Sequence, residues 1–254
     1  MNKIIGIVSG KGGVGKTTLC ANIAFSLAAG GKKVIAVDGD ISLKNLDIPL
    51  GMTDKTAYDL SDVISGACSA ERAIAQHDDY PGLYFMSAPQ SASVSSDPEG
   101  LRELCEELRR DYDFVLIDAP AGVGEWVRKI IRCCDECIVV ATPDLTSLRD
   151  AQRVVSLIAD NGDAPSKLVI NKVSPPMINR GYLQNIDDMM DSVSLPLLGL
   201  VPTDDSIVIY SNGGKPVYGS KSVCSGPFCN IAMRLCGKNV PLDKYWRKNK
   251  NRQK

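Results

Sequence analysis

A glycine-rich stretch near the amino terminus has the residue types that bind a polyphosphate. It reads Ser9-Gly10-Lys11-Gly12-Gly13-Val14-Gly15-Lys16-Thr17-Thr18 and matches the pattern G-x-x-x-x-G-K-[ST]. Glycines let consecutive backbone N–H groups turn toward one anion, and the start of a following helix adds its positive end. We expect Lys16 to reach the β- and γ-phosphates and the Thr17 hydroxyl to ligate Mg²⁺. The stretch therefore predicts a nucleotide site.

Carboxylates follow two apolar runs farther along the chain. Residues 34–37 lead into Asp38-Gly39-Asp40, and residues 114–117 lead into Asp118. Short continuous apolar runs are typical of parallel strands buried on both faces, and ligands bind at the carboxyl ends of such strands. Of Asp38 and Asp40, one carboxylate is expected to orient a water and the other to hold Mg²⁺ through its water shell. Asp118 is expected to face the same Mg²⁺.

The elements that must position these groups alternate between strands and helices. Apolar runs predict strands at residues 4–8, 34–37, 83–88, 114–118, 138–141, 167–170 and 198–201. A helix is predicted after the glycine-rich stretch from Leu19, Ile23 and Leu27, ending at Gly30-Gly31, and another at residues 99–110. The fold class predicted is α/β, the three-layer P-loop NTPase fold, with a mostly parallel central sheet and helices on both faces.

Bulk composition excludes several classes of protein. The 254 residues contain no visible linker, and a formal net charge of −1 gives no global basic field to hold nucleic acid. We see no leader and no apolar run approaching ~18 residues, so the expected location is cytoplasmic. Nine cysteines are expected to be reduced thiols, with the C-x-x-C of Cys134 and Cys137 packed in the core. The single histidine, His77, is expected on a surface loop.

Three motifs together resemble the MinD/ParA family of ATPases. The run K-G-G-V-G-K-T-T resembles that family's deviant phosphate loop, in which the additional lysine, here Lys11, reaches across a dimer interface to the partner's nucleotide. D-G-D-I-S-L-K-N-L-D resembles the first switch, which implies that Asp40 positions the hydrolytic water and that Asp38 lies in the Mg²⁺ shell. The sequence D-A-P-A-G, ending at Gly122, resembles the second switch, whose glycine could present its N–H to the γ-phosphate and swing when that phosphate leaves.

The same resemblance extends to the second half of the chain. An amide at the end of the strand at 167–170 can donate to and accept from a purine, and the resemblance makes Asn171 the adenine reader, with Pro202 lining the base pocket. Residues 142–150 resemble another family stretch, in which we expect Thr146 to cap a helix. Asp150 is implied there as a contact to a partner.

The resemblance covers residues 3–240 and implies a function. Residues 1–240 would form an ATPase domain with ATP or ADP and Mg²⁺ as cofactors, and residues 241–254 a basic, flexible tail. An ATP-dependent homodimer would hydrolyse ATP slowly until a partner stimulates it. It would place the division septum by recruiting an inhibitor and responding to an activator. The tail has cations but no apolar stripe. Weak contact with the inner face of an anionic membrane and no membrane contact at all therefore both stay open.

Other functions remain as alternatives. A ParA-type DNA-partitioning ATPase needs a basic stripe on the folded dimer, which the net charge does not indicate. A flagellar-number regulator usually carries an amino-terminal extension, whereas the first strand here starts at residue 3. An iron–sulfur protein of this family needs cysteines at spacings that this chain lacks, and a non-enzymatic sensor is disfavoured by the three carboxylates.

Overall fold

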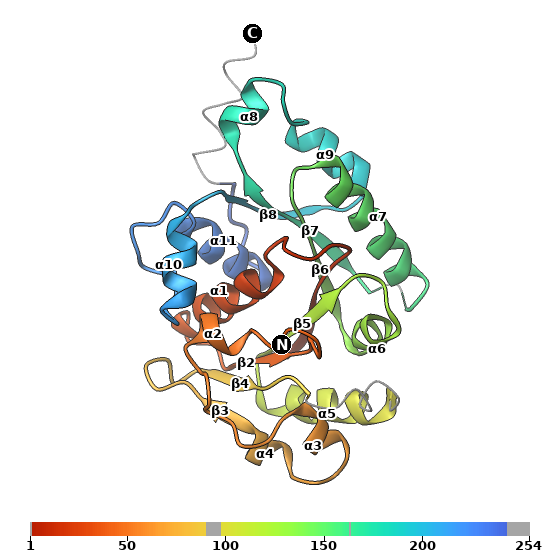
Figure 1. The fold of residues 1–254 in the computed structure, drawn as a ribbon, viewed down its shortest axis with the longest axis vertical. Helices are drawn as coiled ribbons and strands as arrows, with labels where there is room; N and C mark the ends of the chain where they lie inside the picture. Colours follow the sequence, from red (N-terminus) through yellow and green to blue (C-terminus); the bar gives the residue numbers. More distant parts are fainter. Residues whose placement is uncertain (1, 90–97, 163, 243–254) are drawn as a thin grey trace.

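In the part of the chain that the computed structural model describes, residues 2–89, 98–162 and 164–242, eight strands form one central sheet (Figure 1). Their order is β3-β4-β2-β5-β1-β6-β7-β8, and neighbouring strands are parallel except β3, which is antiparallel to β4. The strands are β1 (Lys3–Ser9), β2 (Val34–Asp38), β3 (Ile74–Gln76), β4 (Leu83–Met86), β5 (Phe114–Ala121), β6 (Glu136–Ala141), β7 (Ser166–Val173) and β8 (Leu197–Pro202). The mostly parallel sheet is confirmed. The short edge strand β3 has no counterpart among the predicted strands.

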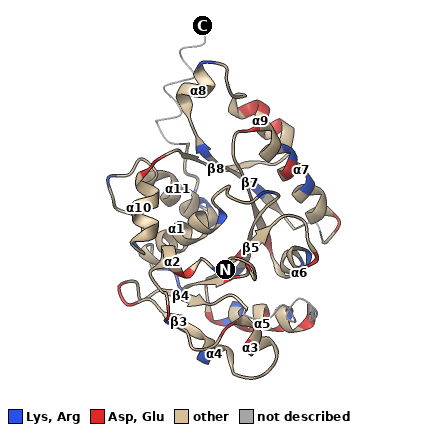
Figure 2. Cartoon of the chain, viewed as in Figure 1, with Lys and Arg blue, Asp and Glu red and all other residues tan. Residues whose placement is uncertain are grey.

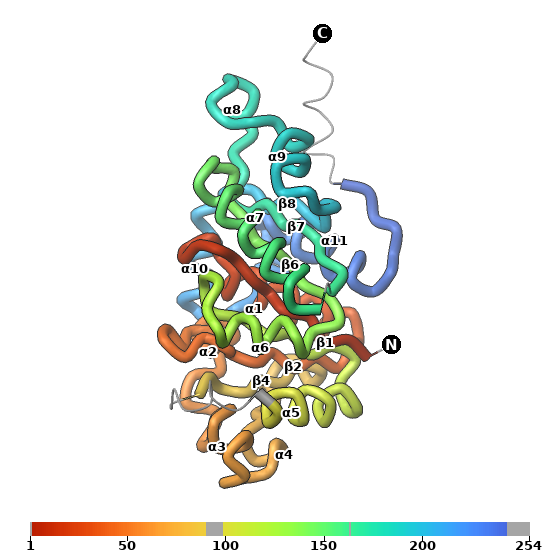
Figure 3. Tube along the Cα trace, turned by 90° about the vertical axis from the view of Figure 1, so that its right-hand side faces the viewer, coloured from red at the N-terminus to blue at the C-terminus, as the bar shows by residue number. Residues whose placement is uncertain are grey.

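Helices cover both faces of this sheet and bury two separate apolar cores. Along β1, Ile5 and Ile7 enter one core while Ile4 and Val8 enter the other, as the alternation of side chains in a strand requires. The first core is covered by α1 (Lys16–Ala29), α2 (Asp47–Leu50), α10 (Ser206–Asn212) and α11 (Ser225–Leu235). The second is covered by α3 (Leu60–Ile64), α4 (Ala70–Ala73), α5 (Pro98–Asp111), α6 (Glu125–Cys133), α7 (Leu145–Ala159), α8 (Pro175–Asn179) and α9 (Ile186–Val193). In Figure 3 the helices α6, α7 and α9 face the viewer. The three-layer α/β fold is confirmed.

The ends of two helices test the predicted capping signals. Helix α1 ends at Ala29, followed by Gly30 as its cap, which confirms the predicted stop at Gly30-Gly31. The prediction that Thr146 caps α7 is wrong, because Asp144 occupies the N-cap position. The Asp144 carboxylate accepts the Ser147 N–H at 2.9 Å, so the cap lies two residues before the predicted one.

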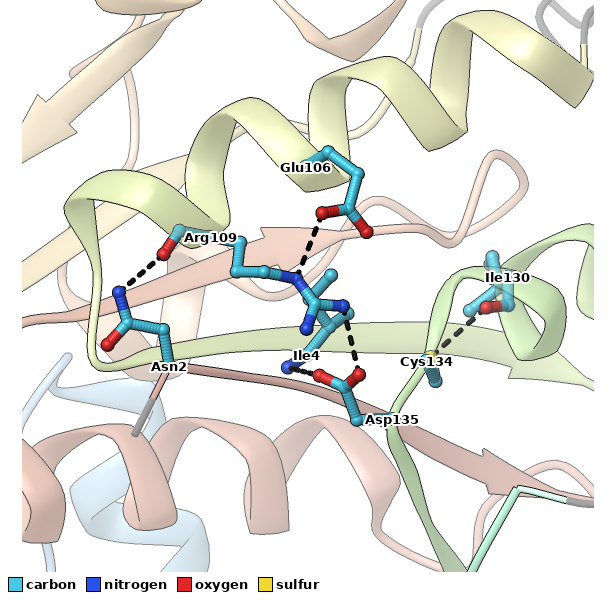
Figure 4. A network of polar contacts seen from close by, with 7 residues as sticks. All are labelled: Asn2, Ile4, Glu106, Arg109, Ile130, Cys134 and Asp135. Carbon is cyan, nitrogen blue, oxygen red and sulfur yellow. Dashed lines mark hydrogen bonds and ion pairs between the residues drawn. The ribbon is translucent and has the colours of Figure 1, made fainter.

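Polar contacts at the amino-terminal edge of the sheet tie α5 to the strands (Figure 4). The Asp135 carboxylate accepts the Ile4 N–H at 2.8 Å and lies 2.9 Å from an Arg109 guanidinium nitrogen, while Glu106 pairs with the same guanidinium. Asn2 donates to the Arg109 carbonyl at 2.6 Å. The network lies at the opposite edge from the glycine-rich loop, so it stabilises the scaffold without entering the site.

The cysteine prediction is confirmed, and His77 lies in the predicted loop. Cys137 is buried in the second core and Cys134 packs against it, and all the cysteines are free thiols. His77 lies in the loop after β3 and is half-buried, with its ring packed edge-on against Phe25 and Tyr80. In the described residues, no helix is long and apolar enough to cross a membrane.

Candidate functional site

The glycine-rich loop joins β1 to α1 and presents an open row of backbone donors. The N–H groups of residues 12–17 find no acceptor among the residues that the structure describes. Gly15 is the N-cap of α1 at φ 94, a left-handed conformation that L side chains rarely adopt. Gly10 has no room for a side chain either, since a Cβ there would lie 2.3 Å from the Asp150 carbonyl oxygen. The loop can therefore cradle an anion at the start of a helix.

Lys16 and Thr17 turn this cradle into a site for a charged polyphosphate. Lys16 is buried, and that burial lowers the pKa of its ammonium group, while Asp118 and Asp40 act in the opposite direction. A buried ammonium group in this position can pair with the negative charge of a bound phosphate. The Thr17 hydroxyl donates to the Asp118 carboxylate at 2.6 Å.

Asp38 and Asp118 lie side by side on β2 and β5, as their strand register shows. Burial raises the pKa of Asp118 to about 7 and that of Asp38 to about 6. The second Asp118 oxygen is buried without a hydrogen-bond partner. Both Asp38 oxygens accept backbone N–H groups, from Asp40 at 2.9 Å and from Leu46 at 3.1 Å.

A divalent cation fits the Thr17 and Asp118 oxygens. Mg²⁺ prefers one or two carboxylate or hydroxyl oxygens from the protein, with phosphate and water oxygens completing its shell. The unpartnered Asp118 oxygen and the raised pKa of that carboxylate are the features that a nearby cation would relieve. Among the described residues no group of three or more His, Cys, Asp or Glu could hold a metal ion by itself. Neither Asp38 nor Asp118 lines the pocket itself, and Asp38 also accepts the Leu46 N–H of the adjacent 39–46 loop.

The two switch segments are brought to the loop, but in different ways. Asp40 lines the pocket, and its Oδ1 accepts the Ser42 and Leu43 N–H groups at 3.0 and 3.1 Å, which leaves the other oxygen for a water. The Gly122 N–H instead donates to the Ser9 carbonyl at 2.8 Å, with φ at 100°. Gly122 must break this bond before it can reach a phosphate, so its predicted role requires the segment to move.

A pocket of about 570 Å³ beside the loop has the size of a nucleotide site. Loop residues form one wall, and the carboxyl ends of β7 and β8 with the start of α10 form the other: Asn171, Lys172, Pro202, Thr203, Asp204, Asp205, Ile207 and Val208. Asn171 and Pro202 therefore both line this pocket. The sequence reasoning missed Lys172, Ile207 and Val208. Their position just after apolar runs at the ligand-binding edge was the available signal.

The Asn171 amide is held against the loop. Its Nδ2 donates to the Val14 carbonyl at 2.8 Å, and its Oδ1 accepts the Lys172 N–H at 2.9 Å. One N–H and one lone pair remain, which is the pair of groups that the amino edge of adenine can bond. A Cβ on Gly15 would lie 2.3 Å from this Nδ2, so the amide and the loop pack directly together.

Lys11 does not line the nucleotide-sized pocket of its own chain. Its ammonium lies 3.7 Å from Asp144 Oδ1, and both side chains are about half-exposed, at 45% and 46%. An exposed pair at this distance contributes little to stability. Lys11 also lines a second cavity, of about 390 Å³, on the far side of the loop. Asp150 abuts Gly10 through its backbone, and its carboxylate pairs with Arg153.

Comparisons with known proteins agree with this geometry. The family described as the CobQ/CobB/MinD/ParA nucleotide binding domain matches residues 5–217. The septum site-determining protein MinD of Bacillus subtilis (strain 168) is 37% identical over 254 residues, covering 98% of this chain and 95% of that protein. MinD of Thermotoga maritima is 36% identical over 96% of this chain and 91% of its own length.

Solved structures give the same result. The MinC:MinD cell division protein complex of Aquifex aeolicus contains a chain with a TM-score of 0.89 and 33% identity, covering 95% of this chain and 98% of that one. MinD of Pyrococcus horikoshii OT3, complexed with Mg-ADP, has a TM-score of 0.82 and 30% identity over 94% of this chain and 100% of that one. A ParA family ATPase of Chlorobium tepidum, at 22% identity and a TM-score of 0.78, shows likeness of fold alone.

Proposed function

Because the chain belongs to the CobQ/CobB/MinD/ParA family of nucleotide-binding proteins, we propose that it is an ATP-driven switch that determines the site of the division septum. It is an ATPase that takes ATP or ADP with Mg²⁺ as its cofactors. The observation that carries the proposal is the open row of N–H groups at residues 12–17 beside Lys16, Thr17 and Asp118.

The chain's own residues divide the work of hydrolysis. The loop N–H groups and Lys16 bind the β- and γ-phosphates, and Asn171 with Pro202 holds the base. Thr17 and Asp118 hold Mg²⁺, with Asp38 supporting the adjoining loop. When bound, the cation neutralises charge on the phosphate oxygens. Asp40 orients the attacking water through its free carboxylate oxygen. Gly122 lets the second switch follow the γ-phosphate once its N–H leaves the Ser9 carbonyl.

Lys11 makes hydrolysis depend on a second copy of the chain. Lys11 does not line the nucleotide pocket of its own chain, and within the described residues it pairs with the half-exposed Asp144. That weak pair costs little to break. In the proposed ATP-bound homodimer, Lys11 leaves Asp144 and reaches the phosphates of the partner subunit, which links dimerisation to catalysis.

Replacing Lys11 tests this link. Lys11→Ala is expected to bind ATP normally but to lose ATP-dependent dimerisation and hydrolysis, measured by light scattering after size-exclusion chromatography and by phosphate release. Lys238→Ala, an exposed lysine beyond α11, is the matched control and should behave as the wild type. Dimerisation of the Lys11 variant at the wild-type level would overturn the role of Lys11.

Protein partners and a membrane complete the proposal. The MinC:MinD complex of Aquifex aeolicus supports a protein partner for this chain, which we take to be a division inhibitor, with a second partner that activates the ATPase. The predicted tail comprises residues 241–254, after an ATPase domain at residues 1–240. From residue 243 onward, the tail lies outside the described residues. We assign it weak, salt-sensitive contact with anionic lipid at the inner face of the cell membrane.

Co-sedimentation with anionic vesicles tests the membrane contact. Pelleting that requires ATP instead of ADP, and that disappears when residues 241–254 are deleted, supports it. Pelleting in neither nucleotide state removes the membrane from the proposal. Lys/Arg and Asp/Glu both occur along α5, α6 and α7 (Figure 2). Salt-dependent binding to nonspecific DNA would favour a partitioning role instead.

A further inference from the structure

Two consecutive residues at the end of β7 both reach the phosphate loop, which a regular strand does not allow. Side chains alternate between the two faces of a strand, so neighbours normally point in opposite directions. Here the pairing of β7 with β8 shifts register between Ile170 and Val173, where three steps along β7 oppose two along β8. Lys172 adopts a left-handed backbone conformation, with φ at 56°. A bulge of this kind re-aims side chains, and it brings Asn171 and Lys172 to the same loop.

The two side chains hold two consecutive carbonyl groups of that loop. The Lys172 ammonium donates to the Gly13 carbonyl at 2.7 Å, and Asn171 Nδ2 donates to the Val14 carbonyl at 2.8 Å. The Lys172 N–H in turn donates to Asn171 Oδ1 at 2.9 Å, so the two residues are coupled. The buried Asn171 therefore hydrogen-bonds to the helix side of the loop, and the exposed Lys172 hydrogen-bonds to its tip.

The hydrogen bond from Lys172 to the Gly13 carbonyl sets the orientation of the peptide groups at the tip of the loop. Gly12 and Gly13 have no side chain to restrict their backbone, and a Cβ on either would meet nothing within 4 Å. The peptide groups here are therefore the easiest part of the loop to turn over. A carbonyl turned toward a phosphate would repel it, whereas a carbonyl held by an ammonium on the outside leaves the N–H groups facing inward.

Lys172 also stands between two cavities. It lines both the pocket of about 570 Å³ that holds the nucleotide in the proposed function and the cavity of about 390 Å³ that Lys11 lines. The loop tip, Gly12 and Gly13, forms the rest of that shared boundary together with Thr203. Losing the lysine would remove the hydrogen bond that holds this boundary at the Gly13 carbonyl.

We infer that Lys172 is a positioning residue, which fixes the tip of the phosphate loop in its anion-binding conformation and thereby slows nucleotide release. It acts through the Gly13 carbonyl and not by contact with the phosphates. This inference rests on the proposed function, because it concerns the same nucleotide pocket. Asn171 secures the base side of the loop, and Lys172 secures the phosphate side.

The test compares Lys172→Met, which keeps the length of the side chain without a donor, with Lys172→Arg, which restores a donor. Lys238→Met is the matched control on an exposed lysine beyond α11. The probes are ADP and ATP with Mg²⁺, with binding measured by calorimetry and release by stopped-flow with a fluorescent ADP. Lys172→Met is expected to bind ADP about tenfold more weakly, mainly through faster release, because one charge-assisted hydrogen bond is lost. Lys172→Arg should recover most of that loss.

Several outcomes separate this inference from its competitors. The fold loss of affinity in Lys172→Met should be the same for ADP and ATP and should persist at high salt. A loss of affinity that is larger for ATP than for ADP and becomes smaller at high salt would mean that Lys172 contacts the phosphates directly. That result would overturn the inference. Wild-type binding by Lys172→Met, or no recovery in Lys172→Arg, would also overturn it. So would an unfolding temperature of the nucleotide-free Lys172→Met protein low enough to account for the weaker binding. If the wild type itself fails to bind ADP, the proposed function fails instead.

Discussion

Ionising the buried carboxylates below the phosphate loop should destabilise the nucleotide-free protein as the pH rises. Burial raises the pKa of Asp118 from 3.8 to about 7 and that of Asp38 from 3.8 to about 6. In the unfolded chain both groups ionise near 3.8, so between these values the folded state holds more protons than the unfolded state. Their stabilising contribution is therefore complete below pH 3.8 and is lost as the pH passes the folded values.

The size of the effect follows from the shift of Asp118. A rise from 3.8 to about 7 corresponds to about 4 kcal/mol at about 1.36 kcal/mol per pH unit. About 2 kcal/mol of this falls between about pH 5.5 and pH 7, a range in which most other carboxylates stay ionised. Because Asp118 is 2% exposed, solvent screening reduces this figure little.

Urea unfolding at about pH 5.5, 6.5 and 7.5, without Mg²⁺ or nucleotide, measures this loss. The free energy of unfolding should fall by about 2 kcal/mol across the range. Asp118→Asn cannot ionise and should keep less than half of the slope, whereas the exposed control Glu71→Gln should keep all of it. Mg²⁺ and ADP added together should flatten the profile, because they bind the ionised carboxylate. A flat wild-type profile, or a full slope in Asp118→Asn, would refute the reasoning.

Three further substitutions probe the loop and the scaffold. Lys16→Ala should abolish ATP binding in calorimetry while the protein stays folded by circular dichroism, because the loop loses its buried cation. Retained micromolar affinity would contradict this. Gly15→Ala should weaken ADP binding more than tenfold and lower the unfolding temperature, since its Cβ would lie 2.3 Å from the Asn171 amide at a φ of 94°; wild-type values for both would contradict the packing. Asp135→Ala should lower the free energy of unfolding in urea by about 2 kcal/mol without changing ADP affinity, because it leaves the buried Ile4 N–H without its acceptor. An unchanged unfolding midpoint would show that water replaces the carboxylate.

The sequence determined the chemistry that depends on neighbouring residues. The spacing of glycines, Lys16 and Thr17 specifies an anion-binding turn, because it acts through local backbone geometry. Apolar runs that end in Asp38 and Asp118 specify buried parallel strands with carboxylates at the same edge, because parallel strands share one direction. These patterns were sufficient to predict the three-layer fold and the side of the sheet that carries the site.

Only the tertiary structure decided how those groups meet. Lys172 contacts Gly13 across 159 positions of sequence, through a strand bulge that no local pattern announces. The Gly122 N–H is held by Ser9, Lys11 is paired with Asp144, and one Asp118 oxygen is left without a partner. Such contacts depend on the packing of several distant elements at once. Residue type and spacing can therefore state which groups are available, while the fold sets their partners, their burial and their charge state.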